Sequence, residues 1–166
     1  MTVALVDQRH FRDVLGHYPT GVVVVTGMAP DGRPGGAPAG MVIGSFTSVS
    51  LDPPLVAFLP RKDSRTFARL RTAPSFCVNV LAAEQERMCG GLGGERPGDL
   101  GRLPWHPAPS GAPVLDGVVA WIDCLPEQVI DGGDHHIVLC RVTGLSAESA
   151  GSPLLFFRGG YGRFAG

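Results

Sequence analysis

The chain has 166 residues, of which 44% are hydrophobic and 17% are charged, and its formal net charge is -1. A chain of this length forms one domain with a substantial core, so we expect a single domain over residues 1–166. The balanced charge and the single lysine, Lys62, argue against a nucleic-acid-binding surface and a polybasic membrane patch. The apolar runs are short and broken, and none is long enough to span a bilayer.

The N-terminus and the cysteines predict a cytoplasmic protein. The opening residues MTVALVDQRHFRDVL include acidic side chains and lack the apolar core of a signal peptide. The four cysteines are far apart and form no CxxC or CxxH pair. This spacing favours reduced thiols over a disulfide framework or a zinc site. The cysteines are Cys77, Cys89, Cys124 and Cys140.

The first third of the chain predicts one helix followed by strands. Residues 8–15 have an amphipathic pattern that predicts a short helix, which Pro19 ends. The β-branched run at 22–26 predicts a buried strand, and the Gly- and Pro-rich segment 29–39 predicts a hairpin connection. Two further strands are expected, joined by the corner Asp52-Pro53-Pro54. Their ranges are 41–50 and 55–59.

The middle of the chain predicts two short helices. Asp63 or Ser64 can cap a helix that runs to about Arg71. A strand over 75–81 and a second short helix over 83–89 follow. Residues 90–111 are loop-like, with Trp105 as the large anchoring side chain.

The last third predicts a long hairpin and a final strand. The long strand 118–130 is bent near Pro126, and Asp-Gly-Gly-Asp at 131–134 is a strong turn signal. Strands at 136–144 and 154–157 follow. Because the strands outnumber the helices and no βαβ alternation is present, we expect a closed or nearly closed antiparallel barrel with short helices.

The sequence lacks the motifs of several common catalytic and nucleotide-binding sites. The sequence has no GxGxxG after a strand, no phosphate-binding P-loop and no GxSxG nucleophile elbow. Adjacent His135 and His136 resemble metal ligands, but on a strand they point to opposite faces. We therefore expect no metal site, with one histidine in a site or the core and the other at the surface.

Four hydroxyl side chains lie within the strand expected at 41–50. Ser45 and Thr47 share one face, while Ser48 and Ser50 share the other with Phe46. Two interpretations remain open. The hydroxyls either bond across the sheet to neighbouring strands, or they form an uncharged polar wall for a large flat ligand.

The start of the helix near Ser64 also has two interpretations. Free N–H groups, the hydroxyls of Ser64 and Thr66, and the cations at 61, 62 and 65 together resemble a phosphate site. The alternative is an ordinary capped helix with solvated basic residues. A ligand with a flat ring at one end and a phosphate at the other would suit both this segment and the hydroxyl strand.

Six sequence blocks, in order and at plausible spacing, carry a resemblance to a known family. The chain resembles the flavin reductase-like, split-barrel flavin-binding domains, many of which are reductase halves of two-component flavin monooxygenases. The resemblance implies a mainly β fold, an antiparallel split β-barrel of Greek-key type with short flanking helices, and a homodimer. The blocks are FRDVLGHYPTGVVVVT, GMVIGSFTSVSLDPPLV, KDSRTF, FCVNVL, GGDHHIVLCRV and PLLFFRGGY.

The resemblance also implies a flavin site. Two positions depart from the family pattern: Ile43-Gly44 replaces a more polar residue, so contacts there would be mostly backbone, and Cys140 replaces a glycine. The segment that would wrap the isoalloxazine and ribityl groups comprises Val42, Ile43, Gly44, Ser45, Phe46, Ser48 and Val49. Phosphate or ribityl would be held by Asp63, Ser64 and Arg65, with Arg69 and Leu70 close behind, and Glu95 and Arg96 would reach the adenylate half of FAD.

By the same resemblance, His135 lies near the nicotinamide side of the flavin. The implied reaction is hydride transfer from NADH or NADPH to FMN or FAD, and the reduced flavin would diffuse to a separate oxygenase. The alternatives are a flavoprotein that uses bound FMN for another redox reaction and a non-catalytic flavin-binding module. The residues expected to bind the nicotinamide nucleotide are Phe156, Phe157, Arg158 and Gly159.

Overall fold

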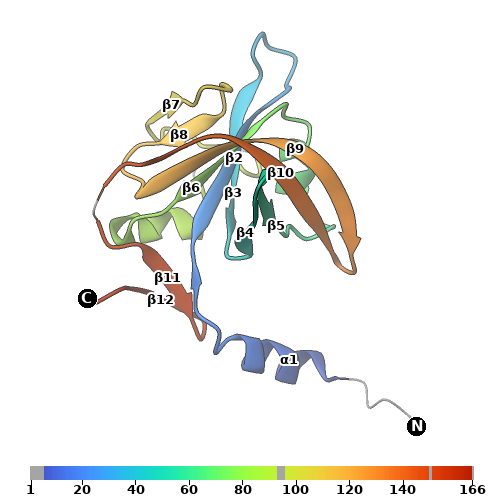
Figure 1. Cartoon of the computed structure of the whole chain (residues 1–166), viewed down its shortest axis with the longest axis vertical. Coiled ribbons are helices and arrows are strands. Elements are labelled where there is room, and N and C mark those ends of the chain that lie inside the picture. The colour runs from blue at the N-terminus through green and yellow to red at the C-terminus, as the bar shows by residue number, and fades with distance from the viewer. Residues whose placement is uncertain (1–5, 93–95, 150, 166) are drawn as a thin grey trace.

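A computed structural model describes residues 6–92, 96–149 and 151–165 of the chain. Two α-helices and one 3-10 helix accompany twelve strands among these residues (Figure 1). The helices are α1 (Gln8–Leu15), α2 (Arg65–Leu70) and the 3-10 helix η1 (Ala83–Gly90). The strands are β1 (Thr20–Gly21), β2 (Val23–Ala29), β3 (Ala37–Ile43), β4 (Phe46–Leu51), β5 (Pro54–Phe58), β6 (Phe76–Val80), β7 (Trp105–Pro107), β8 (Pro113–Leu115), β9 (Ala120–Gly132), β10 (His135–Ala147), β11 (Leu154–Phe157) and β12 (Gly160–Arg163).

One seven-stranded antiparallel sheet forms most of the molecule. Its strand order is β3-β2-β6-β9-β10-β5-β4, and the sheet curls into an incomplete barrel (Figure 1). The two end strands, β3 and β4, share no ladder within the described residues, so the barrel is split rather than closed. The mainly β, antiparallel fold class predicted from the sequence is confirmed.

The core explains why β2 is apolar on both faces. Val23 and Val25 face the barrel interior, where the rings of Phe58 and Phe76 meet edge to face with centroids 5.7 Å apart. Val24 faces a second cluster, formed with the segment that contains β7 and β8. Since each face of β2 is covered by apolar side chains, the alternation typical of a half-exposed strand is absent.

Two buried polar side chains fasten the β8 segment to the sheet. Asn79 of β6 accepts a hydrogen bond from the backbone N–H of Leu115 at 2.8 Å and donates to the Thr26 hydroxyl at 3.0 Å. The Thr26 hydroxyl donates in turn to the carbonyl of Pro113. These polar atoms are therefore satisfied, as buried groups must be for a stable fold.

The long β9–β10 hairpin has the bend predicted near Pro126. Cys140 pairs with Pro126 and Leu139 pairs with Gln128, so Glu127 is an extra residue on β9. This register shift is a β-bulge, which gives proline a place in a strand without a lost ladder bond. The hairpin is longer than expected, because β10 continues to Ala147.

The prediction of one continuous strand over 41–50 is wrong. The chain breaks at Gly44 and Ser45, and β3 and β4 lie at opposite ends of the sheet order. The strand β12 was also not predicted, because its sequence Gly-Tyr-Gly-Arg has few strand-forming residues. It pairs with β11, which also pairs with β1 in a separate three-stranded sheet.

An N-terminal arm, residues 8–21, extends away from the barrel (Figure 1). Its helix α1 was predicted correctly, and Asp7 caps it by accepting a hydrogen bond from the N–H of His10 at 3.1 Å. No α1 residue is buried, and the apolar side chains Phe11, Val14 and Leu15 are each more than half exposed. The arm is joined to the small sheet through β1.

Candidate functional site

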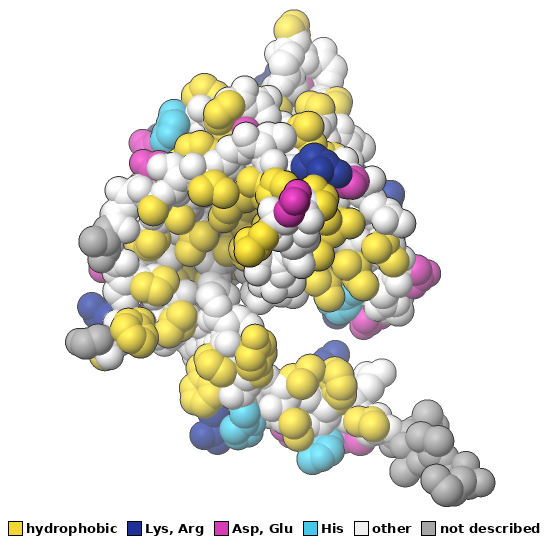
Figure 2. All heavy atoms as spheres, in the orientation of Figure 1, with side chains coloured by type: hydrophobic (Ala, Val, Ile, Leu, Met, Phe, Trp, Pro, Cys, Tyr) yellow, Lys and Arg dark blue, Asp and Glu magenta, His cyan; other side chains and the backbone are white. Residues whose placement is uncertain are grey.

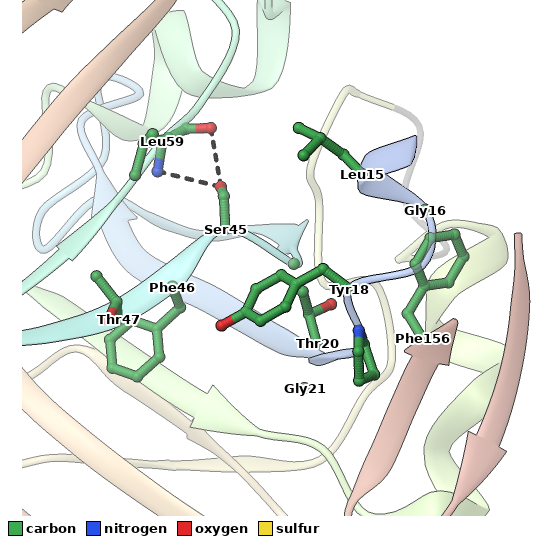
Figure 3. A pocket seen from close by; sticks show the side chains of 12 residues that line it. Leu15, Gly16, Tyr18, Thr20, Gly21, Ser45, Phe46, Thr47, Leu59 and Phe156 are labelled. Atoms are coloured by element: carbon green, nitrogen blue, oxygen red, sulfur yellow. Dashed lines mark hydrogen bonds between the residues drawn. The ribbon is translucent and has the colours of Figure 1, made fainter. Parts of the chain in front are cut away.

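A groove of about 620 Å³ lies between the N-terminal arm and the break that separates β3 from β4 (Figure 3). Its volume is within the range of small-molecule sites, roughly 300–1,000 Å³. Apolar walls and a few hydroxyls line it, which suits a flat, partly polar ligand. The lining residues are Leu15, Gly16, Tyr18, Pro19, Thr20, Gly21, Gly44, Ser45, Phe46, Thr47, Leu59 and Phe156.

Gly44 keeps the floor of the groove open. A Cβ atom at this position would lie 3.2 Å from Oγ1 of Thr20 on the arm and 4.0 Å from the carbonyl oxygen of Gly21. The first distance is tighter than an ordinary van der Waals contact. Any side chain at residue 44 would therefore compete for the space where the arm faces the barrel.

Ser45 fastens the break to the end of β5. Its hydroxyl donates to the carbonyl of Leu59 at 3.0 Å and accepts from the N–H of the same residue at 3.2 Å (Figure 3). For this residue, bonding across to a neighbouring strand is the correct interpretation. The hydroxyl thus fixes the groove wall, while the Thr47 hydroxyl donates to the neighbouring Ser48 carbonyl at 3.2 Å.

Replacing Ser45 with alanine is expected to lower the free energy of unfolding by about 1 kcal/mol, because two hydrogen bonds to Leu59 are lost. Denaturant titration measures this change. Ser50→Ala on β4 is the matched control, since that hydroxyl makes no hydrogen bond within the described residues. Equal stabilities for the two variants would show that the Ser45 bonds contribute nothing.

Several residues predicted to contact flavin do not face the groove with their side chains. Ile43 is buried in the barrel core, and Val42 packs against the second core cluster. Leu70 is completely buried, so its side chain cannot line a surface site. Ser48 and Val49 are exposed further along the edge strand β4. At residue 43, only backbone groups are available to a ligand, whereas the side chain of Val42 is partly buried.

The predicted phosphate segment contains a carboxylate that is already paired. Nε and Nη2 of Arg61 donate to the two carboxylate oxygens of Asp63 at 2.8 and 2.7 Å. The hydrogen bond from Arg61 lowers the pKa of Asp63, which keeps this carboxyl anionic. An anionic carboxylate repels phosphate but can accept hydrogen bonds from ribityl hydroxyls. Of the two contacts predicted for this segment, phosphate or ribityl, only the ribityl contact therefore suits Asp63, and it stays a prediction.

The remaining groups at the start of α2 have different roles. The Ser64 hydroxyl accepts from the N–H of Phe67 at 3.0 Å and so caps the helix. Lys62 pairs with Asp131 at 2.9 Å. Arg65 is exposed and forms no ion pair with any described residue. It is the cation of this segment that remains available to an anionic ligand.

Arg69 and Arg96 belong to a charged cluster beside α2. Nη1 of Arg69 contacts the Asp99 carboxylate, and Arg96 lies 3.6 Å from both Asp99 and Asp31. The Nη2 atom of Arg69 is buried and has no hydrogen-bond partner among the described residues. These arginines are therefore engaged with carboxylates, and Glu95 lies outside the described residues.

The two adjacent histidines diverge as predicted. His136 packs on the core ring of Phe67, with centroids 5.7 Å apart, whereas the His135 side chain is 37% exposed. His135 forms an isolated bridge with Arg61, two residues beyond the groove-lining Leu59. His135 therefore lies next to the segment 59–61, which begins in the groove wall and continues beyond it. The described residues contain no group of three or more potential metal ligands.

The turn between β11 and β12 is tied to the arm. Arg158 adopts a positive φ of 49° and donates its backbone N–H to the carbonyl of Gly16 at 2.9 Å. Phe156 lines the groove, but Phe157 faces a second hollow and meets His17 edge to face at 6.5 Å. Of the four residues predicted at 156–159, only Phe156 lines the groove.

The arm residues were not predicted as part of the site. Tyr18 and Thr20 line the groove, and the Tyr18 side chain is 74% exposed there. A polar aromatic residue and a proline directly after a helix were the available signal. That signal could not show that the arm lies opposite Gly44, because the contact depends on the tertiary fold.

Comparison with known proteins decides the family. The model of the flavin reductase like domain matches residues 15–165. The chain belongs to the flavin reductase-like domain family. A flavin reductase of Pseudomonas putida is 48% identical over 96% of this chain and 92% of its own length. The reductase subunit HsaB of a flavin-dependent monooxygenase from Rhodococcus jostii is 44% identical, over 94% of this chain and 77% of its own.

A solved structure agrees with this assignment. The Streptomyces globisporus NADH:FAD oxidoreductase SgcE6, in complex with NAD and FAD fragments, superimposes with a TM-score of 0.84. It is 37% identical and covers 99% of this chain and 97% of the other. Membership of the flavin reductase-like family makes a flavin the cofactor whose fit to the groove is to be tested.

The groove fits a flavin in shape and chemistry. The ring walls of Tyr18, Phe46 and Phe156 suit a flat aromatic system, and Thr20 offers a hydroxyl to a carbonyl group. The missing side chain at Gly44 leaves room for a ring against the backbone. These residues would hold the flavin, because a mostly apolar lining with a few hydroxyls suits a flat ring that carries carbonyl groups.

Proposed function

We propose that this protein is an NAD(P)H:flavin oxidoreductase that reduces FMN or FAD and supplies the reduced flavin to a separate monooxygenase. The groove beside Gly44 is the observation that carries the proposal, because it offers an open, uncharged, aromatic-lined site. Relatives named as flavin reductases and as reductase subunits of flavin-dependent monooxygenases support the same activity.

The chain's own residues bind and orient the reactants. The bound flavin supplies the redox chemistry by accepting a hydride. The aromatic walls hold one ring while the open side of the groove admits a nicotinamide, and this alignment supplies most of the rate enhancement. His135, at the edge of this region, orients the nicotinamide or holds a proton beside it. Arg158 is the cation that would meet the dinucleotide.

The activity is tested by following the ultraviolet absorbance of NADH and NADPH with desalted protein. FMN, FAD or no flavin is added in separate reactions. We expect oxidation that depends on added flavin. The combination of nucleotide and flavin with the highest rate identifies the preferred hydride donor and the preferred flavin. A protein that binds flavin but oxidises neither nucleotide would overturn the proposal in favour of a non-catalytic binding module.

Arg65→Ala is expected to weaken flavin binding by about 1–3 kcal/mol, the value of one charge-assisted hydrogen bond to phosphate. Arg65 is the exposed cation of its segment without a carboxylate partner among the described residues. Fluorescence titration with FMN and with riboflavin, which lacks the phosphate, measures the effect. The loss should appear with FMN only; an equal loss with riboflavin would remove the phosphate role.

The homodimer also forms part of this proposal. A separate helix of eight residues is marginal in water, yet α1 has no buried side chain. Hydrophobic side chains gather on α1 and on the small sheet beside it (Figure 2). In the small sheet, Phe157 and Tyr161 are exposed, and so is Phe164 directly after β12. A second copy of the chain would cover these surfaces.

Light scattering after gel filtration tests the dimer. We expect twice the chain mass of 17.4 kDa for the native protein. Phe11→Asp should release monomers, because it places a carboxylate on the apolar face of α1. Arg9→Asp introduces the same group on the opposite face of the helix and should leave the dimer intact. A native protein that is monomeric at all concentrations would contradict the proposal.

The thiols support a cytoplasmic location. All four cysteines are free, and Cys77, Cys124 and Cys140 are buried. Burial raises the pKa of the Cys77 thiol to about 12, so this group stays protonated and unreactive. Free thiols in the core suit a reducing compartment. No helix within the described ranges has the length and apolar character to cross a membrane.

A further inference from the structure

His135 has a charged neighbour with no role so far. Nδ1 of His135 lies 2.7 Å from Oδ1 of Asp134, and the Asp134 side chain is 81% exposed. The hydrogen bond from His135 lowers the pKa of Asp134, so the carboxylate is ionised at neutral pH. An ionised carboxylate can only accept hydrogen bonds, and Nδ1 must therefore carry the proton.

The backbone holds this pair in place from both sides. The N–H of Lys62 donates to the carbonyl of Asp134 at 2.9 Å, and the N–H of His136 donates to the carbonyl of Pro60 at 2.9 Å. The turn preceding Asp134 is closed at Gly133, which has a φ of 80°. Because the backbone is fixed, the remaining freedom of His135 is rotation about its two side-chain bonds, which the hydrogen bond to the carboxylate restrains.

The fixed tautomer determines what the other ring nitrogen can do. With the proton on Nδ1, Nε2 is an acceptor in the neutral ring and a donor in the protonated ring. Nε2 makes no hydrogen bond within the described residues. Nε2 is therefore the ring atom that can contact a ligand extending out of the groove past Leu59 and Arg61.

We propose that Asp134 is a positioning residue that fixes the orientation and tautomer of His135 for flavin reduction. The proposal rests on the role assigned to His135 under the proposed function. The remaining charged groups around the ring are the Arg61–Asp63 pair, while Lys62 and Asp131 pair with each other. The charge of His135 also lowers the pKa of Asp63, but Asp134 is the carboxylate within hydrogen-bond distance of the imidazole among the described residues.

The structure provides a matched control in the same turn. Asp131 is also exposed, and its Oδ1 accepts hydrogen bonds from Lys62 at 2.9 Å and from the N–H of Gly133 at 3.0 Å. An asparagine at 131 keeps an acceptor oxygen for the N–H of Gly133. Asp131→Asn thus removes one negative charge from the turn without altering the contact to His135.

The test combines kinetics with NMR of the histidine rings. Asp134→Ala should lower kcat for NAD(P)H oxidation about ten- to hundredfold, the loss typical when a hydrogen-bond partner of a metal-ligating histidine is removed. Flavin affinity should be unchanged, and Asp131→Asn should retain native kcat. Long-range proton–nitrogen spectra should show the Nδ1–H tautomer of His135 in the native protein and a mixture of tautomers in Asp134→Ala.

A double-mutant cycle separates this inference from the proposed function. If Asp134 acts through His135, Asp134→Ala should have no further effect on kcat in a His135→Ala background. An undiminished further loss, or an unchanged tautomer in Asp134→Ala, would overturn the positioning role. Native kcat in His135→Ala alone would instead remove the role of His135, although flavin-dependent oxidation itself would still stand.

Discussion

His135→Ala is expected to lower the turnover of flavin reduction about hundredfold while leaving flavin affinity within about a factor of two. The imidazole lies beside the segment 59–61, at the edge of the groove and not in its lining. Its loss should therefore affect how the nicotinamide is held rather than how the flavin binds. Steady-state rates at saturating flavin measure the first quantity, and fluorescence titration of the oxidised flavin measures the second.

His106→Ala is the control for this variant. The His106 side chain is 57% exposed and also lies near a carboxylate, with Nδ1 3.2 Å from Oδ1 of Asp116. It lies on β7, outside the groove, so the substitution should leave turnover unchanged. Normal turnover in His135→Ala would place the hydride-transfer machinery elsewhere, whereas equal losses in both variants would indicate a general effect on stability.

Gly44→Leu is expected to weaken flavin binding about ten- to hundredfold, which corresponds to about 1–3 kcal/mol of overpacking. The new Cβ would lie 3.2 Å from Oγ1 of Thr20, and the rest of the side chain would occupy the groove. Because residue 44 is exposed, the folded protein should tolerate the change. Flavin titration and thermal unfolding, measured on the same preparation, separate the two effects.

Gly90→Leu is the matched control, because a Cβ at Gly90 meets no atom within 4 Å. This variant has the same change in side-chain size at a position outside the groove. It should bind flavin as the native protein does. If Gly44→Leu also bound flavin normally, the groove beside the arm would not be the flavin site.

Strand β2, the β9–β10 hairpin and the histidine pair were predictable because local pattern determined them. The apolar run of β2 is covered on both faces, and Asp-Gly-Gly-Asp closes the β9–β10 hairpin. The period of a strand alone separates His135 from His136. In these places, local propensity and tertiary packing favour the same structure, and the sequence was therefore sufficient.

The shape of the groove was not predictable, because it depends on contacts between distant segments. The break at Gly44 interrupts a stretch that reads as one strand, and its position matches the arm residue Thr20. Nothing local to Tyr18 indicates that it faces this break. The ion pair between Arg61 and Asp63 likewise could not be predicted from the spacing of charges in this segment.

One anaerobic mixing experiment tests most directly whether this protein reduces the flavin that it binds. The protein is loaded with one equivalent of its preferred flavin, and NADH or NADPH is added while the visible absorbance of the flavin is followed. We predict that the absorbance bleaches at least as fast as steady-state turnover. A bound flavin that stays oxidised with both nucleotides would contradict the account.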